Sequence, residues 1–166
     1  MGAGKTSVGR ALAERIGWEF EDLDDRIVRN QARSVAEIFS ESGEAEFRRV
    51  EREALKEVIR ELARGATRII ALGGGAFVQK DNAARLKASG IPTVFLNAPV
   101  EELWERCRKQ VEESGNARPL LASLEKFRAL HESRRNHYRK ASLQVDTGGR
   151  GVEAIASEIA RALKLA

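Results

Sequence analysis

The chain has 166 residues, of which 42% are hydrophobic and 33% charged, with a formal net charge of +4. This length and apolar content suit one domain with its own core, and a single cysteine excludes an internal disulfide framework. The positive net charge suits a protein that handles phosphates. A nucleic-acid stacking surface needs a run of Lys and Arg interleaved with aromatic residues, and the sequence has none. No apolar run is long enough to span a membrane. We therefore expect a cytoplasmic protein with no nucleic-acid or membrane partner, and separately we expect a monomer.

The N-terminal residues match the end of a phosphate-binding loop. Gly4-Lys5-Thr6 fits the last part of the pattern G-x-x-x-x-G-K-[ST], although the first glycine of that pattern would precede Met1. A helix with an apolar stripe follows and ends at Gly17. Backbone amides here would bind phosphate oxygens, Lys5 would reach the β- and γ-phosphates, and the Thr6 hydroxyl would help to hold Mg²⁺. The alternative is a flexible glycine-containing segment before an ordinary helix.

Short apolar segments then alternate with helical ones, which is typical of an α/β fold with a parallel sheet. We predict strands over 18–23, 68–72, 91–96 and 143–146. We predict helices from Ser34, which forms a capping box with Glu37, and over 44–64, 81–89, 99–111, 123–138 and 152–163. The polar stretch 112–121 lacks periodicity and is predicted to be a mobile loop.

Two carboxylates stand near the end of the first predicted strand. Asp22 and Asp24 are two residues apart, so a strand would place both side chains on the same side. In open parallel sheets ligands bind beyond the carboxyl ends of the strands. One carboxylate would hold Mg²⁺ and the other would accept a proton from a substrate hydroxyl. The alternative is a solvated acidic turn.

Four further segments carry groups suited to an anionic substrate. Arg48 and Glu51 share a helix face, either as a surface ion pair or as part of a clamp for a substrate carboxylate. The triplet Gly73-Gly74-Gly75 after a strand indicates close approach to the backbone, or a tight turn. Arg118, in the predicted loop, would neutralise phosphoryl charge on closing, or lie on a plain exposed loop. Arg134 would face the site, or belong to a solvated basic face.

Together these segments resemble one family, the shikimate kinases, over essentially the whole chain. The motifs that carry the resemblance are Gly-Lys-Thr at 4–6, Asp-Leu-Asp at 22–24, Phe-Arg-Arg-Val-Glu at 47–51, the triple glycine at 73–75, Arg-Pro-Leu-Leu at 118–121 and the segment 134–138. The resemblance implies a single domain over 1–166 with a three-layer P-loop kinase fold. In the family the parallel sheet has five strands. A substrate-binding helical region would lie at about 24–62 and a mobile lid at about 112–122.

The resemblance also implies an activity, cofactors and residue roles. The activity is transfer of the γ-phosphate of ATP to the 3-hydroxyl of shikimate, on the route to chorismate and the aromatic amino acids, with Mg²⁺. Lys5, Asp24 and Arg118 match catalytic positions, and Thr6 and Asp22 match metal positions. The ATP-binding positions are Gly2, Ala3, Gly4, Lys5, Thr6, Ser7, Arg106, Arg118 and Arg150. The shikimate-binding positions are Asp24, Arg48, Glu51, Gly73, Gly74, Gly75 and Arg134.

The sequence departs from the family in two ways. The segment 109–116 is longer than usual. The family's first strand and first loop glycine have no counterpart here, so we expect a shortened kinase in which neighbouring strands lose backbone partners on one side. Two other functions remain open: a gluconate or nucleoside monophosphate kinase of the same fold, and a nucleotide-binding module without catalysis.

Overall fold

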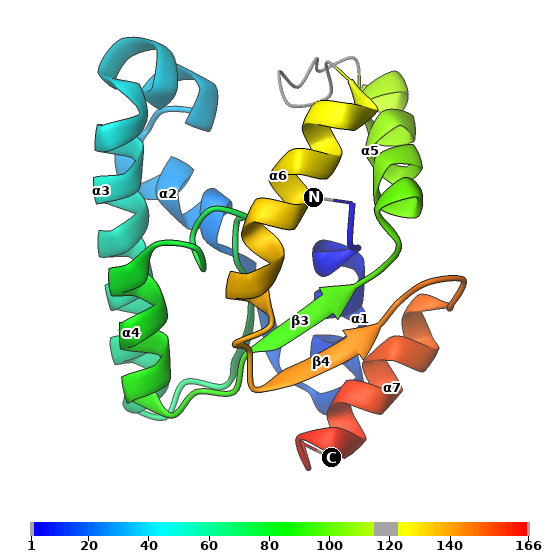
Figure 1. Cartoon of the computed structure of the whole chain (residues 1–166). Coiled ribbons are helices and arrows are strands. Elements are labelled where there is room, and N and C mark those ends of the chain that lie inside the picture. Colours follow the sequence, from blue (N-terminus) through cyan, green and yellow to red (C-terminus); the bar gives the residue numbers. More distant parts are fainter. Residues whose placement is uncertain (1, 115–122, 166) are drawn as a thin grey trace.

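The computed structural model describes residues 2–114 and 123–165, which form an α/β structure of seven helices and four strands (Figure 1). In chain order the elements are α1 (Lys5–Ile16), β1 (Glu19–Asp22), α2 (Leu23–Gln31), α3 (Val35–Ala63), β2 (Arg68–Ala71), α4 (Lys80–Ser89), β3 (Val94–Asn97), α5 (Val100–Ser114), α6 (Leu124–Tyr138), β4 (Leu143–Asp146) and α7 (Val152–Ala162). Within these ranges, every helix is too short or too polar to cross a lipid bilayer.

Most of the predicted elements are present with small shifts at their ends. The strand over 143–146 is found as predicted, whereas the strand predicted from residue 91 begins at Val94. The residue pattern does not predict α2, whose acidic first turn looks like the end of a strand. The predicted lid falls largely on residues 115–122, which lie outside the described part of the chain.

Helix α3 contains a kink that separates the two helices predicted there. Gly43 has φ 79° and ψ 175°, a conformation open to glycine and strained for other residues. The capping box at the start of α3 is confirmed. The Ser34 Oγ accepts from the Glu37 N–H at 3.2 Å, and the Ser34 N–H donates to the Glu37 carboxylate at 2.6 Å.

The strands pair in parallel, as predicted, but in two separate sheets. β1 pairs with β2 from Glu19 opposite Arg68 to Asp22 opposite Ala71. β3 pairs with β4 in the same way over four residues. Between the described residues of β2 and β3 there is no strand pairing, so each of these strands uses only one of its two edges.

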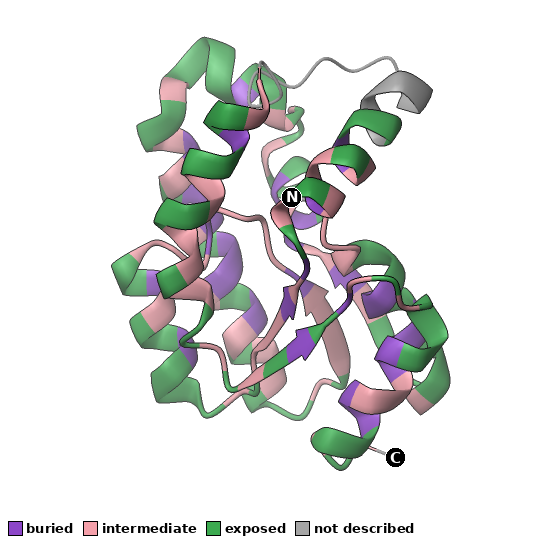
Figure 2. Ribbon diagram, turned by 45° about the vertical axis from the view of Figure 1, so that its right-hand side comes forward, coloured by how far each residue is buried: buried purple, intermediate pink, exposed green. Residues whose placement is uncertain are grey.

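Buried residues lie along the strands and on the inward faces of the helices around them (Figure 2), and their apolar side chains form separate clusters. One cluster joins α2, α3 and α4 and includes Ile27, Leu55 and Val58. A second joins α1, α7, β3 and β4 and includes Leu12 and Val145, and a smaller third cluster joins α5 and α6 through Leu103 and Phe127. Helices therefore cover both faces of the strands, which leaves the carboxyl ends of the strands as the accessible place for a ligand.

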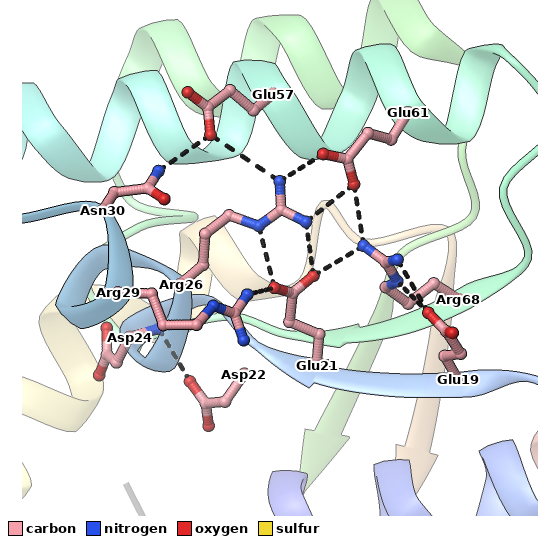
Figure 3. Close-up of polar contacts among 10 residues, drawn as sticks. All are labelled: Glu19, Glu21, Asp22, Asp24, Arg26, Arg29, Asn30, Glu57, Glu61 and Arg68. Atoms are coloured by element: carbon pink, nitrogen blue, oxygen red, sulfur yellow. Dashed lines mark hydrogen bonds and ion pairs between the residues drawn. The ribbon is translucent and has the colours of Figure 1, made fainter.

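A network of ion pairs fixes β1 and β2 against α2 and α3 (Figure 3). The guanidinium of Arg26 is almost fully buried and donates to Glu21 at 2.7 and 3.0 Å and to Glu61 at 2.7 and 2.8 Å. Arg68 joins Glu61 to Glu19 on the strand edge. Burial alone would raise the pKa of Glu21, but hydrogen bonds from Arg26 and its neighbours lower that pKa overall. Buried charges are tolerated when paired in this way, and the pairing holds the start of α2 in place.

Candidate active site

The segment before α1 has the geometry of a phosphate-binding loop. Gly4 caps the helix in the left-handed conformation, with φ 77°. Gly2 approaches α5 so closely that a Cβ there would lie 2.4 Å from the Leu103 carbonyl oxygen. The first turn of α1 has no acidic residue and no side-chain cap, so its amides and its positive dipole end suit an anion. Lys5 and the exposed Thr6 and Ser7 stand at this end.

Two arginines predicted to lie near the nucleotide are found around the segment after β4. Arg106, on α5, donates to the Thr147 carbonyl at 3.3 Å and to the Gly2 carbonyl at 3.5 Å. Arg150 donates to the Asp146 carbonyl at 2.7 Å and pairs with Glu158. The structure therefore places Arg106 directly beside the phosphate loop and Arg150 on the adjoining β4–α7 connection.

The two predicted carboxylates lie close together, but for a different reason from the one expected. Asp22 ends β1 and caps α2, because its Oδ1 accepts from the Asp24 N–H at 3.0 Å. Asp24 is in the first turn of α2, so the prediction that both project from one strand is wrong. Burial raises the pKa of Asp24, as do the charges of Asp22 and Asp25, whereas Lys5 and Arg48 oppose the rise. Lys5 and Arg48 are thus close enough to act on the Asp24 carboxylate.

Arg48 and Glu51 form an ion pair that turns inward from α3. The Arg48 Nη1 lies 2.9 Å from the Glu51 Oε2, and only 1% of the Glu51 side chain is exposed. Burial raises the pKa of Glu51, and the hydrogen bond and charge of Arg48 oppose this. The Nε of Arg48 is buried and has no hydrogen-bond partner among the described residues. Because a buried donor without a partner is costly, this N–H is a candidate donor to a ligand.

The three glycines after β2 let the charged groups converge. A Cβ on Gly73 would lie 3.5 Å from the Asp24 Oδ1 and 3.6 Å from the Glu51 Oε1. On Gly74 it would lie 3.3 Å from the Arg134 Nη1, and on Gly75 it would lie 2.6 Å from both terminal nitrogens of Arg48. Side chains on this segment would therefore occupy the space where two arginines and two carboxylates meet.

Tyr138, the last residue of the segment 134–138, also contacts the glycine segment, although sequence reasoning gave it no role. Its hydroxyl donates a hydrogen bond to the Gly74 carbonyl, and its ring packs against Phe95 of β3 with the ring centroids 5.3 Å apart. Burial raises the pKa of the Tyr138 hydroxyl, which keeps it a donor at neutral pH. The sequence pattern that could have indicated this role of Tyr138 is its i, i+4 spacing from Arg134, which places both side chains on one face of α6.

The structure brings most of the predicted site residues together in one cluster, with Asp22 and the phosphate loop beside it. The residues of this cluster are Lys5, Asp24, Arg48, Glu51, Gly73, Gly74, Gly75 and Arg134. Arg118 lies outside the described residues. The cluster pairs a cationic clamp with a buried carboxylate and an anion-binding helix end. That combination suits a small anionic substrate with a hydroxyl group next to a bound polyphosphate.

Comparison with known proteins gives one consistent family. A family model described as shikimate kinase matches residues 1–164. The shikimate kinase of Geobacter metallireducens is 40% identical over 162 residues, which cover 96% of this chain and 85% of that protein. The shikimate kinase of Thermus thermophilus is also 40% identical, with 98% of this chain and 85% of that protein covered. A solved shikimate kinase from Acinetobacter baumannii in complex with shikimate superposes with a TM-score of 0.85 at 34% identity, covering 99% of this chain and 88% of that one.

Proposed function

This chain belongs to the shikimate kinase family, and we propose that the cluster around Asp24, Arg48 and Arg134 is the site of its kinase reaction. The reaction is the transfer of the γ-phosphate of ATP to the 3-hydroxyl of shikimate. The observation that carries the site assignment is the convergence of these side chains, from three different helices, on the glycines at 73–75.

Arg48 and Arg134 bind the shikimate carboxylate from two sides of the glycine segment. The buried Nε of Arg48, which has no partner among the described groups, supports this role, because a carboxylate accepts two parallel N–H bonds from one guanidinium. Glu51 acts as a positioning residue, since its 2.9 Å contact with Arg48 fixes the direction of that guanidinium. The absence of side chains at 73–75 leaves room for the substrate ring.

Asp24 orients the reacting hydroxyl and accepts its proton. Its raised pKa makes its carboxylate a stronger base than an ordinary aspartate, which favours proton transfer in the reaction. Lys5 and the amides at the start of α1 bind the phosphates and stabilise charge on the transferring group. We assign Arg118 to the lid, where it would add a further positive charge at the phosphates.

ATP is the co-substrate that the family implies, and we propose Mg²⁺ as its metal. Thr6 and Asp22 fit this ion, because a hydroxyl and a carboxylate supply the hard oxygen donors that Mg²⁺ takes together with phosphate oxygens and water. The described residues contain no group of three or more His, Cys, Asp or Glu that could hold a metal without ATP. A bound Mg²⁺ would neutralise charge on the β- and γ-phosphates.

Arg106 and Arg150 would lie at the adenine end of the nucleotide, since both surround the connection after β4. We further propose that the enzyme is a cytoplasmic monomer. The family match covers nearly the whole chain, so two alternative functions are not favoured: a gluconate or nucleoside monophosphate kinase, and a nucleotide-binding module without catalysis.

A coupled assay of ADP release tests the function. Shikimate, gluconate and nucleoside monophosphates are supplied in turn with ATP and Mg²⁺. ADP release is expected when shikimate is the acceptor and not with the other acceptors. Titration calorimetry of ATP and shikimate separately accompanies the assay. ADP release with another acceptor, or binding of both ligands without turnover, would contradict the proposal.

A further inference from the structure

Glu102, in the first turn of α5, joins this helix to the β4–α7 connection, residues 147–151. Its Oε1 accepts a hydrogen bond from the Arg106 Nη2, one turn along the helix, and another from the Gly149 N–H at 3.3 Å. A Cβ on Gly148 would lie 3.3 Å from the Glu102 Oε2. Both carboxylate oxygens of Glu102 therefore lie against the connection.

The β4–α7 connection is fixed to the end of β3 at its first residue. The N–H of Thr147 donates to the Asn97 carbonyl at 2.7 Å, and the Thr147 hydroxyl donates to the same oxygen at 3.1 Å. The Thr147 carbonyl accepts from the Arg106 Nη2 at 3.3 Å. Gly149 has a left-handed φ of 62° and turns the chain toward Glu102. The guanidinium of Arg106 therefore lies between a fixed carbonyl and the Glu102 carboxylate.

The contacts of Arg106 suit a guanidinium that stacks on a flat group. Its three acceptors are the Glu102 carboxylate and the carbonyls of Thr147 and Gly2. Because the N–H bonds of a guanidinium lie in its plane, these contacts occupy its edge and leave its faces for stacking. Glu102 is the charged acceptor among the three, and a charge-assisted hydrogen bond is roughly twice as strong as a neutral one. The direction of the Arg106 side chain therefore depends mainly on Glu102.

An ordinary ion pair on a helix surface is the simpler explanation of the Glu102–Arg106 contact, and the neighbouring residue provides a comparison. Glu101, in the same turn, pairs with Arg128 at 2.8 Å, and these two side chains are 61% and 51% exposed. Glu102 and Arg106 are both 32% exposed, and Glu102 also binds the Gly149 amide of a distant segment. Glu102 therefore fixes an arrangement of several segments, which a surface ion pair does not do.

We propose that Glu102 is a positioning residue for ATP, which acts by holding the Arg106 guanidinium in the direction that contacts the adenine end of the nucleotide. This inference rests on the proposed role of Arg106. An arginine that is not held in one direction has to be ordered when the ligand binds, and the lost freedom weakens binding. Removal of Glu102 should therefore weaken ATP binding and leave shikimate binding, at the glycine segment, unchanged.

The test is a double-mutant cycle in the 166-residue protein, with Glu102→Ala, Arg106→Ala and the double variant. Titration calorimetry measures the binding of ATP with Mg²⁺ and of shikimate separately, so the result is independent of which acceptor is phosphorylated. Thermal unfolding verifies that each variant is folded. We expect ATP binding to weaken about fivefold in Glu102→Ala and about tenfold in Arg106→Ala. Adding Glu102→Ala to Arg106→Ala should weaken it by less than about twofold further, and shikimate binding should stay within about twofold throughout.

Two further variants separate positioning from a general effect on α5. Glu102→Gln keeps an oxygen acceptor of the same reach, so it should retain ATP affinity within about twofold. Glu101→Ala is the matched control, because it also removes an acidic residue and an ion pair from the first turn of α5, and it should leave ATP affinity unchanged.

Three outcomes would overturn the proposal: unchanged ATP affinity in Glu102→Ala, an equal loss in Glu101→Ala, or losses that add fully in the double variant. Full additivity would show that Glu102 does not act through Arg106. Unchanged ATP affinity in Arg106→Ala would contradict the proposed role of Arg106 as well. A loss in Arg106→Ala without one in Glu102→Ala would contradict the inference about Glu102 alone.

Discussion

Replacement of Arg48 by Ala should weaken shikimate binding much more than ATP binding. The guanidinium is proposed to make charge-assisted hydrogen bonds to the substrate carboxylate, and truncating one partner of such a buried pair costs about 2–5 kcal/mol. At about 1.4 kcal/mol per factor of ten, the smaller figure corresponds to a loss of roughly 30-fold in affinity. The phosphate loop lies on a different element, α1, so the ATP affinity should stay within about twofold.

The same substitution also affects stability, which has to be separated from binding. Arg48 is 19% exposed and its partner Glu51 is 1% exposed, so removing Arg48 leaves a buried carboxylate without its partner. Breaking a buried ion pair costs about 3–5 kcal/mol, and the partial exposure of Arg48 makes this an upper limit. The double variant Arg48→Met with Glu51→Gln removes both charges and should recover most of the thermal stability, while shikimate binding stays weak.

Titration calorimetry with each ligand separately, together with thermal unfolding, measures these effects. Arg49→Ala is the matched control, because Arg49 is the next residue on α3 and its ion pair with Glu46 lies at the surface, with 57% of the Arg49 side chain exposed. This control should leave both affinities unchanged. The reasoning is refuted if the folded double variant binds shikimate normally, or if ATP affinity falls as much as shikimate affinity.

Four further predictions follow from the geometry. Gly75→Ala places a methyl group 2.6 Å from the guanidinium of Arg48 and should raise the KM for shikimate at least about tenfold. The control Gly151→Ala, whose Cβ would meet no atom within 4 Å, should leave this KM unchanged. Burial raises the pKa of Asp24, and the proposed role needs its deprotonated form, so kcat/KM should fall as the pH drops through a pKa higher than that of an ordinary aspartate. A pH–rate profile without this acidic decline contradicts the role. Tyr138→Phe keeps the ring packing and loses one hydrogen bond to the glycine segment, so it should raise the shikimate KM several-fold with the ATP KM unchanged; equal changes would indicate a general structural role. Arg26→Met removes the most buried partner of Glu21, which keeps its pairs with Arg29 and Arg68, so it should lower the free energy of unfolding by less than the about 3–5 kcal/mol of a fully broken buried pair in denaturant titration, with a loss near zero showing that the network contributes little.

The order and type of most elements are determined by local sequence. The Ser34–Glu37 capping box, the left-handed Gly17 after α1 and the strand at 143–146 depend on residues within a few positions of one another. Such interactions are encoded in short patterns, which is why reading along the chain finds them. The spacing of the glycine, arginine and aspartate motifs likewise predicted the family.

Tertiary structure decided how those motifs meet. Asp24 belongs to a helix because Asp22 caps it, and the two carboxylates are close for that reason and not through strand alternation. The link from Tyr138 to Gly74 joins residues far apart in the sequence, and so does the network around Arg26. Which strands have an unpaired edge, β2 and β3 among the described residues, is also a tertiary property, because strand pairing depends on backbone groups that every residue carries. Contacts of this kind leave no local pattern, so only the folded chain reveals them.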